Sequence, residues 1–242
     1  MLGSHERRWW PWAPLLLAQG LYARVRARGM GPAESPQGRV GCGPGARLAG
    51  LGDSIIAGIG VSHHADGLTG QVARCLAASG VSVEWNAIGE SGADSGSVLG
   101  ELLPRAVAWE PDFVVLSVGV NDAVRGTDPG VFKERLRAIV EGLTATRRAP
   151  AVVFGGIPPL DSFPALPRPL ATLLGERARR LQARAVDLAG YRGLKVVSFP
   201  PVLAREAFAH DGFHPRAEGC AAWAGWVADG FALRVAERLD GG

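Results

Sequence analysis

Four short segments place a glycine close to a side chain that can act as a nucleophile, a base or a hydrogen-bond donor. Ser54 offers a hydroxyl, which is a weak nucleophile until a base takes its proton. His214 is the candidate base, because imidazole accepts protons near neutral pH. Asp211 lies three residues earlier, close enough to orient the imidazole and stabilise its charged form. Together these side chains predict acyl transfer through a covalent intermediate.

Acyl transfer also needs donors aimed at the negative charge that develops on the carbonyl oxygen. The backbone N–H groups of Ser54 and Gly92 and the side-chain amide of Asn121 are the candidates. Gly89 is a neighbouring alternative to Gly92. A glycine suits this role because its backbone can approach a substrate with no side chain in the way.

Alternating strands and helices are expected to bring these segments together. Short apolar runs, typical of strands buried on both faces, cover residues 47–51, 81–87, 113–118, 151–154 and 194–199. Helical periodicity covers residues 67–79, 97–109, 129–147, 170–190 and 217–239. This alternation predicts an α/β fold with a five-stranded parallel sheet between two helical layers. Ligands of such sheets bind at the carboxyl ends of the strands, where the candidate residues lie.

The four segments resemble the blocks of the GDSL or SGNH hydrolase family, and its lysophospholipase-like branch in particular. Residues 52–55 read Gly-Asp-Ser-Ile, with Ile where the family commonly has Leu, and residues 86–92 resemble the second block. Residues 119–122 match Gly-x-Asn-Asp, and residues 211–215 match Asp-x-x-His-Pro. The resemblance covers roughly residues 46–240. The Gly-x-Ser-x-Gly elbow, the P-loop and the Gly-x-Gly-x-x-Gly motif are not found in the sequence.

The resemblance implies a three-layer α/β/α sandwich of the flavodoxin-like kind and a serine esterase that uses no metal or other cofactor. It implies Ser54 as nucleophile, His214 as base and then acid, and Asp211 as the orienting carboxylate. Ser54, Gly92 and Asn121 would form the oxyanion hole, and Asp53 would fix the turn. Small to medium acyl esters are the expected substrates. Lysophospholipase or thioesterase activity, carbohydrate O-deacetylation and an idle binding domain are the alternatives.

Other residues of chemical interest favour structural interpretations. His63 and His64 are adjacent, so they point in different directions and are expected in a solvated loop. Trp223 and Trp226 are three residues apart on a predicted helix and are expected in the core rather than at a ligand. Cys75 and Cys220 are expected as small buried residues, and a Pro-rich loop at 158–169 could edge the acyl pocket.

Charge is unevenly distributed along the 242 residues. Residues 1–47 hold seven Arg and two Glu, a balance of +5, whereas residues 48–242 hold nineteen Lys or Arg and twenty-one Asp or Glu, a balance of −2. These values add to the net charge of +3. The body is therefore mildly acidic, which argues against a nucleic-acid partner. The hydrophobic fraction of 47% and the charged fraction of 20% exclude a wholly disordered chain.

The basic N-terminal region is predicted as an extension (residues 1–47) to a hydrolase domain (residues 48–242). Its apolar stretch from Trp9 to Ala23 is flanked by arginines and is short for a membrane span. Arginines also occupy the place of a signal-peptide cleavage site, so a cytoplasmic or peripherally membrane-associated location is favoured over secretion. Residues 1–28 are expected to contact an anionic membrane surface, a second subunit, or the body through Trp12, Leu16 and Leu17. Glycines and prolines predict a linker without regular elements over residues 29–47.

Overall fold

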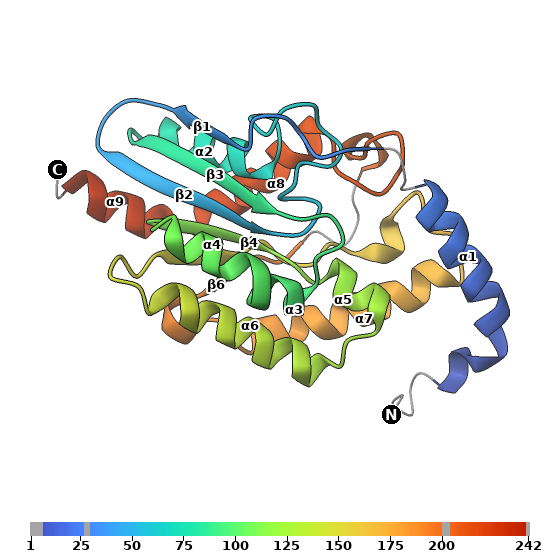
Figure 1. Ribbon diagram of the computed structural model, residues 1–242. Coiled ribbons are helices and arrows are strands. Elements are labelled where there is room, and N and C mark those ends of the chain that lie inside the picture. The colour runs from blue at the N-terminus through green and yellow to red at the C-terminus, as the bar shows by residue number, and fades with distance from the viewer. Residues whose placement is uncertain (1–6, 27–29, 200–203, 241–242) are drawn as a thin grey trace.

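A six-stranded sheet lies between two layers of helices in the computed structural model, which describes residues 7–26, 30–199 and 204–240 (Figure 1). The strand order is β1-β3-β2-β4-β5-β6, and every neighbouring pair is parallel except β1 with β3. The strands are β1 (Gln37–Val40), β2 (Gly45–Gly52), β3 (Ser82–Gly89), β4 (Phe113–Ser117), β5 (Ala151–Phe154) and β6 (Lys195–Val196). The expected three-layer α/β architecture is confirmed.

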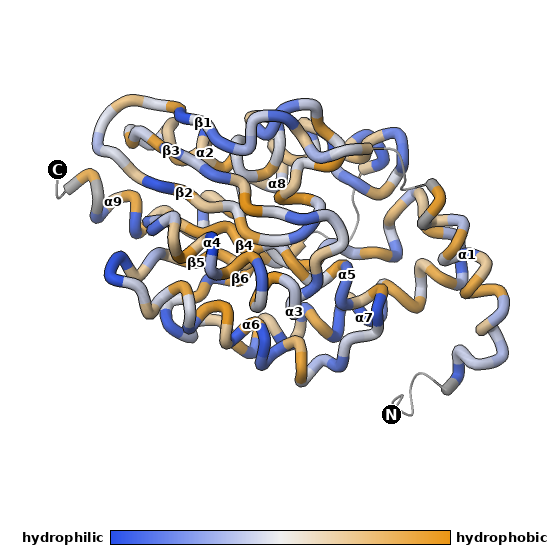
Figure 2. Tube along the Cα trace, in the orientation of Figure 1, coloured by the Kyte–Doolittle hydropathy of each residue, from blue (hydrophilic) through white to orange (hydrophobic). Residues whose placement is uncertain are grey.

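The two helical layers each close one hydrophobic core against the sheet. One layer holds α2 (Leu68–Ala78), α8 (Ala217–Asp229) and α9 (Ala232–Asp240). The other holds α3 (Ser95–Ser97), the π-turn η2 (Val98–Leu102), α4 (Leu103–Ala108), α5 (Val120–Arg125), α6 (Pro129–Thr144) and α7 (Leu170–Val186). Side chains of β4 alternate between the layers: Phe113 and Val115 face the first, Val114 and Leu116 the second. Figure 2 shows the resulting hydrophobic stretches in the centre of the molecule.

The expectation that residues 29–47 contain no regular element is wrong. Gln37–Val40 forms β1, an antiparallel edge strand whose four residues pair with Val83–Asn86 of β3, and β2 begins at Gly45. The sheet therefore has six strands rather than five and starts before residue 48. A local reading of Gly and Pro missed β1 because its hydrogen bonds come from a strand more than forty residues away.

Two helical predictions also need correction, and one helix was not predicted. The segment 217–239 is two helices, because the chain turns at Gly230 and Phe231 between α8 and α9. A Cβ at Gly230 would lie 2.9 Å from a methyl group of Val153, so the backbone there packs closely on β5. The helix predicted from residue 97 begins at Ser95 and contains η2, and the six-residue α5 was not predicted.

The N-terminal region forms a 3₁₀ segment, η1 (Arg7–Trp12), followed by α1 (Ala13–Arg26). Leu16 and Ala23 pack against the core beside α7, so Leu16 behaves as expected. Trp12 and Leu17 do not pack on the body: their exposed fractions are 50% and 76%. Residues 1–6 and 27–29 lie outside the described residues. Among those described, we find no helix with the length and apolar character needed to cross a membrane.

Candidate active site

Ser54, His214 and Asp211 meet at the carboxyl end of β2 in one chain of hydrogen bonds. The distance from Ser54 Oγ to His214 Nε2 is 3.0 Å, and that from His214 Nδ1 to Asp211 Oδ2 is 2.6 Å. All three residues are at most 9% exposed. Residues separated by 160 positions in the sequence thus have the geometry for proton transfer from the hydroxyl to the imidazole.

The turn that carries Ser54 is fixed by its neighbours Gly52 and Asp53. Gly52 has a φ of 153°, and a Cβ there would lie 1.8 Å from the carbonyl oxygen of Ser117. Any other side chain would therefore separate β2 from β4. Oδ1 of Asp53 accepts a hydrogen bond of 3.1 Å from the Ile55 N–H, an Asx-type contact that closes the turn.

Asp211 holds His214 through both the backbone and the side chain. Its Oδ1 accepts hydrogen bonds from the N–H groups of Phe213 (2.9 Å) and His214 (3.0 Å), which leaves Oδ2 for the imidazole. Burial alone would raise the pKa of Asp211, but the hydrogen bonds from the His214 ring and the two N–H groups lower it below its ordinary value. Asp211 is thus kept ionised beside the imidazole, as stabilising an imidazolium requires.

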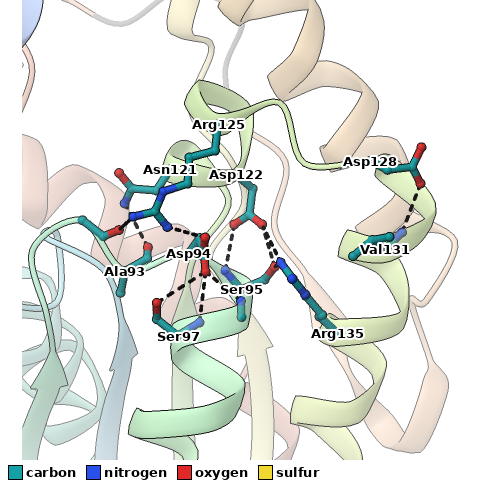
Figure 3. Close-up of polar contacts among 12 residues, drawn as sticks. Ala93, Asp94, Ser95, Ser97, Asn121, Asp122, Arg125, Asp128, Val131 and Arg135 are labelled. Atoms are coloured by element: carbon teal, nitrogen blue, oxygen red, sulfur yellow. Dashed lines mark hydrogen bonds and ion pairs between the residues drawn. The ribbon is translucent and has the colours of Figure 1, made fainter. Parts of the chain in front are cut away.

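Asn121 lies in the first turn of α5 and contacts the loop that contains Gly92. Its Nδ2 donates a hydrogen bond of 2.9 Å to the carbonyl of Ala93 (Figure 3). A side-chain amide has two N–H groups, so this bond orients the amide and leaves one donor for a ligand. The structure thereby joins two of the predicted oxyanion donors, Asn121 and the segment of Gly92, across the strand ends.

Arg125, one helical turn after Asn121, holds the same loop. Its guanidinium donates a hydrogen bond of 3.0 Å to the carbonyl of Gly92 and forms an ion pair with Asp94. Figure 3 shows Asn121 and Arg125 reaching from one helix toward the segment around Asp94. Asp94 also accepts hydrogen bonds from the N–H groups of Gly96 and Ser97 at the start of α3. We call Arg125 and Asp94 the loop clamp.

Gly92 and the alternative, Gly89, have different environments. Gly92 has a φ of 83°, a left-handed conformation that favours glycine, and no atom lies within 4 Å of where a Cβ would be. Gly89 ends β3, and a Cβ there would lie 2.3 Å from the backbone nitrogen of Ala57. Gly89 is therefore a close-packing position beneath the Ser54 turn, whereas Gly92 stands in open space.

Two buried carboxyl groups lie beneath the site. Asp122 is fully buried and accepts hydrogen bonds from the Ser95 N–H (2.9 Å) and hydroxyl (2.6 Å). Asp53 is 1% exposed, and burial, with a smaller contribution from the negative charge of Asp122, raises its pKa to about 7 against the hydrogen bond from the Ile55 N–H. Its ordinary value is 3.8, so this carboxyl group resists ionisation in the fold.

An apolar cavity of about 230 Å³ opens beside Ser54 and Asp53. Its walls carry aromatic rings from the 158–169 loop, the segments around β6 and α8, and the His214 loop: Phe163, Phe199, Phe208, Phe213, Trp223 and Trp226. Phe163 makes edge contacts with Phe208 and Phe213, at ring-centroid distances of 5.0 and 5.2 Å. The Ser54 hydroxyl, the candidate nucleophile, thus lies beside a pocket suited to an apolar group.

Several of these residues were missed or misassigned by the sequence reasoning. Trp223 is buried in the core as expected, but it also lines the cavity, and Trp226 is 40% exposed at the cavity wall rather than in the core. His64 is not solvated: it is 4% exposed, with Nδ1 at 3.1 Å from the Glu34 carbonyl oxygen, while His63 is exposed. Pro158 lines the cavity.

The loop clamp was missed as well, although a signal existed. Arg125 follows Asn121 by four residues, the spacing that places two side chains on one face of a helix.

Cys220 is buried as expected, and burial raises the pKa of its thiol to about 12, whereas Cys75 is only partly buried. Within the described ranges, no three His, Cys, Asp or Glu side chains come together to hold a metal ion.

Fold and site together define an α/β sandwich with a Ser-His-Asp constellation at its strand ends. The GDSL-like lipase/acylhydrolase family matches residues 51–222, a range that includes all five predicted site residues. The chain therefore belongs to this family of GDSL/SGNH esterase- and lipase-type hydrolases. No curated protein sequence matches the chain.

Solved structures share the fold at low sequence identity. TesA is 22% identical with a TM-score of 0.62, and the alignment covers 77% of this chain and 98% of TesA. A family 3 carbohydrate esterase from Clostridium thermocellum is 14% identical with a TM-score of 0.61, covering 80% and 98%. The esterase EstA from Pseudoalteromonas sp., in a structure inhibited by monoethylphosphonate, is 18% identical with a TM-score of 0.59, covering 78% and 98%.

Proposed function

We propose that the protein is a serine carboxylesterase that hydrolyses small to medium acyl esters through an acyl-enzyme. The observation that carries this proposal is the unbroken chain from Ser54 Oγ through the His214 ring to the Asp211 carboxylate, beside an apolar cavity. A buried base within hydrogen-bond reach of a hydroxyl is what nucleophilic catalysis by serine requires.

The reaction has two halves. Ser54 Oγ attacks the ester carbonyl while its proton moves to His214 Nε2, and Asp211 stabilises the imidazolium. The oxyanion would accept hydrogen bonds from the N–H groups of Ser54 and Gly92 and from the Asn121 amide. The bond to the alcohol then breaks, and the alcohol oxygen takes the proton from Nε2. Water, deprotonated by the same nitrogen, attacks the acyl-enzyme and releases the acid and free Ser54.

The cavity supports a medium acyl chain as the preferred substrate. The cavity has about 230 Å³ of space beside Ser54, and its lining is largely apolar and aromatic, so it has room for an acyl chain longer than acetyl. Nitrophenyl esters from acetate to palmitate test this. We expect kcat/KM to rise from acetate to medium chain lengths and then to level off or fall. A maximum at acetate would contradict an acyl role for the cavity.

Loss of Ser54 is the direct test of the nucleophile. We expect Ser54→Ala to abolish turnover and a serine-directed phosphonate to modify the wild-type protein at Ser54 alone, as mass spectrometry would show. Wild-type rates in Ser54→Ala would refute the mechanism. An unlabelled wild-type protein without activity on any ester would instead point to an idle binding domain.

A lysophospholipase or thioesterase is the second candidate, favoured by the aromatic lining of the cavity. Such an apolar lining suits a lipid acyl chain. To test this, kcat/KM would be measured for lysophosphatidylcholine, for acyl-CoA and for a nitrophenyl ester with an acyl chain of equal length. A kcat/KM at least tenfold higher for either natural substrate would favour this second function.

A further inference from the structure

The outer face of η1 and α1 is unusually apolar for a surface. Thirteen large hydrophobic side chains are exposed among the described residues, and seven of them lie between positions 10 and 25: Trp10, Trp12, Leu15, Leu17, Leu21, Tyr22 and Val25. Their exposed fractions run from 42% to 76%, and Figure 2 shows the hydrophobic colours along α1. Isolated exposed apolar residues are ordinary, but a contiguous patch indicates a binding surface. We call these seven residues the N-terminal patch.

The opposite face of α1 is fixed to the body. The Gln19 side chain donates a hydrogen bond of 2.7 Å to the Arg168 carbonyl and accepts one of 3.1 Å from the Leu170 N–H. Leu16 packs against the core, and Arg8 forms an ion pair with Glu176. Because these contacts fix the inner face of α1 to the body, the N-terminal patch faces away from the body.

Charge identifies the kind of partner. Residues 7–28 contain five arginines and no Asp or Glu. A second copy docked through the same face would bring the same positive charge to the interface, with no acidic side chain from this region to pair with it. An anionic lipid surface supplies the opposite charge, and tryptophan and tyrosine favour the boundary between headgroups and acyl chains.

We propose that the N-terminal patch docks the protein on an anionic membrane surface, with α1 lying in the plane of the interface. The fourteen residues of α1 rise about 21 Å, less than the hydrocarbon core of about 30 Å, so the helix lies on the membrane. Docking would set the active site beside the lipid, because Arg168 and Leu170 continue from the loop whose Phe163 lines the cavity.

Vesicle binding by the full-length protein tests the proposal. We expect binding to vesicles of phosphatidylcholine with phosphatidylglycerol and at least tenfold weaker binding to phosphatidylcholine alone. Leu17→Ser with Leu21→Ser should weaken binding to the anionic vesicles at least tenfold, because buried apolar area is lost. Arg24→Gln with Arg26→Gln should weaken it about fivefold per arginine, and added salt should do the same.

Leu233→Ser is the matched control. Leu233 is 74% exposed and lies on α9, at the end of the molecule opposite α1 (Figure 1). This variant should bind vesicles like the wild type. Hydrolysis of a water-soluble nitrophenyl ester should be unchanged in every variant, which separates a failure of docking from a failure of the proposed chemistry.

Three results would overturn the proposal. The first is equal binding to neutral and anionic vesicles. The second is no binding to either by a monomeric protein. The third is a dimer in solution that the Leu17 and Leu21 substitutions disperse, together with no vesicle binding, which would assign the patch to a second copy.

Discussion

The two sides of the candidate site are built in opposite ways. On the nucleophile side, Ser54, His214 and Asp211 bond directly to one another and are shielded from solvent. On the predicted oxyanion side, Gly92 lies in open space, and its loop is held by Asn121 and by Arg125, whose side chain is 51% exposed. The first side depends on contacts among its own three residues, whereas the second also depends on Arg125 and Asp94, which support the loop from outside the predicted oxyanion hole. Substitutions on the first side should therefore remove the chemical step, whereas substitutions of Arg125 or Asp94 should only misplace the loop that contains Gly92.

The nucleophile side should suffer the largest loss. We expect His214→Ala to lower kcat on the order of 10⁶-fold, the effect of removing the base of a serine hydrolase. KM should change little, because the cavity is lined mainly by other residues. Steady-state kinetics with a nitrophenyl ester would measure both. A loss of less than tenfold would mean that His214 is not the base.

Asn121 should come next. Removing one oxyanion donor costs about 100- to 1000-fold in kcat, and Asn121→Ala removes the amide that Ala93 orients. Thermal unfolding of the variant is the control, because the contact with Ala93 is lost as well. A near-normal kcat in a stably folded Asn121→Ala protein would remove Asn121 from the oxyanion hole.

Loss of the loop clamp should have a smaller effect, and this effect should be on kcat rather than on KM. We expect Arg125→Ala to lower kcat by less than the roughly 100-fold that a misplacement of 1 Å can cost, with KM and the melting temperature nearly unchanged. An exposed ion pair contributes little to stability, so a kinetic loss without a thermal one would indicate positioning. Arg137→Ala is the matched control: its side chain is 48% exposed and is paired with Glu134 and Glu141 on α6. Equal kinetics in both variants would contradict the clamp.

Asp53 links the two sides, because the charge of Asp122 helps to raise its pKa. A carboxyl group with a raised pKa in the fold binds its proton more tightly than in the unfolded chain. Its contribution to stability is complete below the ordinary value of 3.8 and falls as pH rises toward about 7. Asp53→Asn should remove this dependence. When the pH rises from 5 to 6, the unfolding free energy of the wild type should fall by roughly 1.4 kcal/mol relative to that of the variant. This change corresponds to about tenfold in the unfolding equilibrium constant. Urea unfolding of both proteins at both pH values measures this difference. Equal changes in the unfolding free energy of the two proteins would contradict a raised pKa of Asp53.

Much of the fold could be predicted because its strands are continuous apolar runs that end in polar motifs. The core of β4 and the positions of Ser54 and Asn121 just after strands follow from that pattern, and His214 was expected in a loop before the last helix. The loop clamp could not be read in the same way, because Arg125 is an exposed arginine that resembles any solvated one until α5 is known. The cavity could not be predicted from the sequence either, because its aromatic rings come from separate segments that only the fold brings together.

The position of β1 has a consequence for how the sheet meets other chains. The two open edges of the sheet are β1, with four residues, and β6, with two. Short edge strands offer few unpaired backbone groups to a foreign strand, which protects a sheet against intermolecular pairing. A chain shortened to begin after Val40 would uncover β3, whose eight residues include the buried Val83 and Trp85. β1, in the segment before β2, thus covers the longer edge that β3 would otherwise expose.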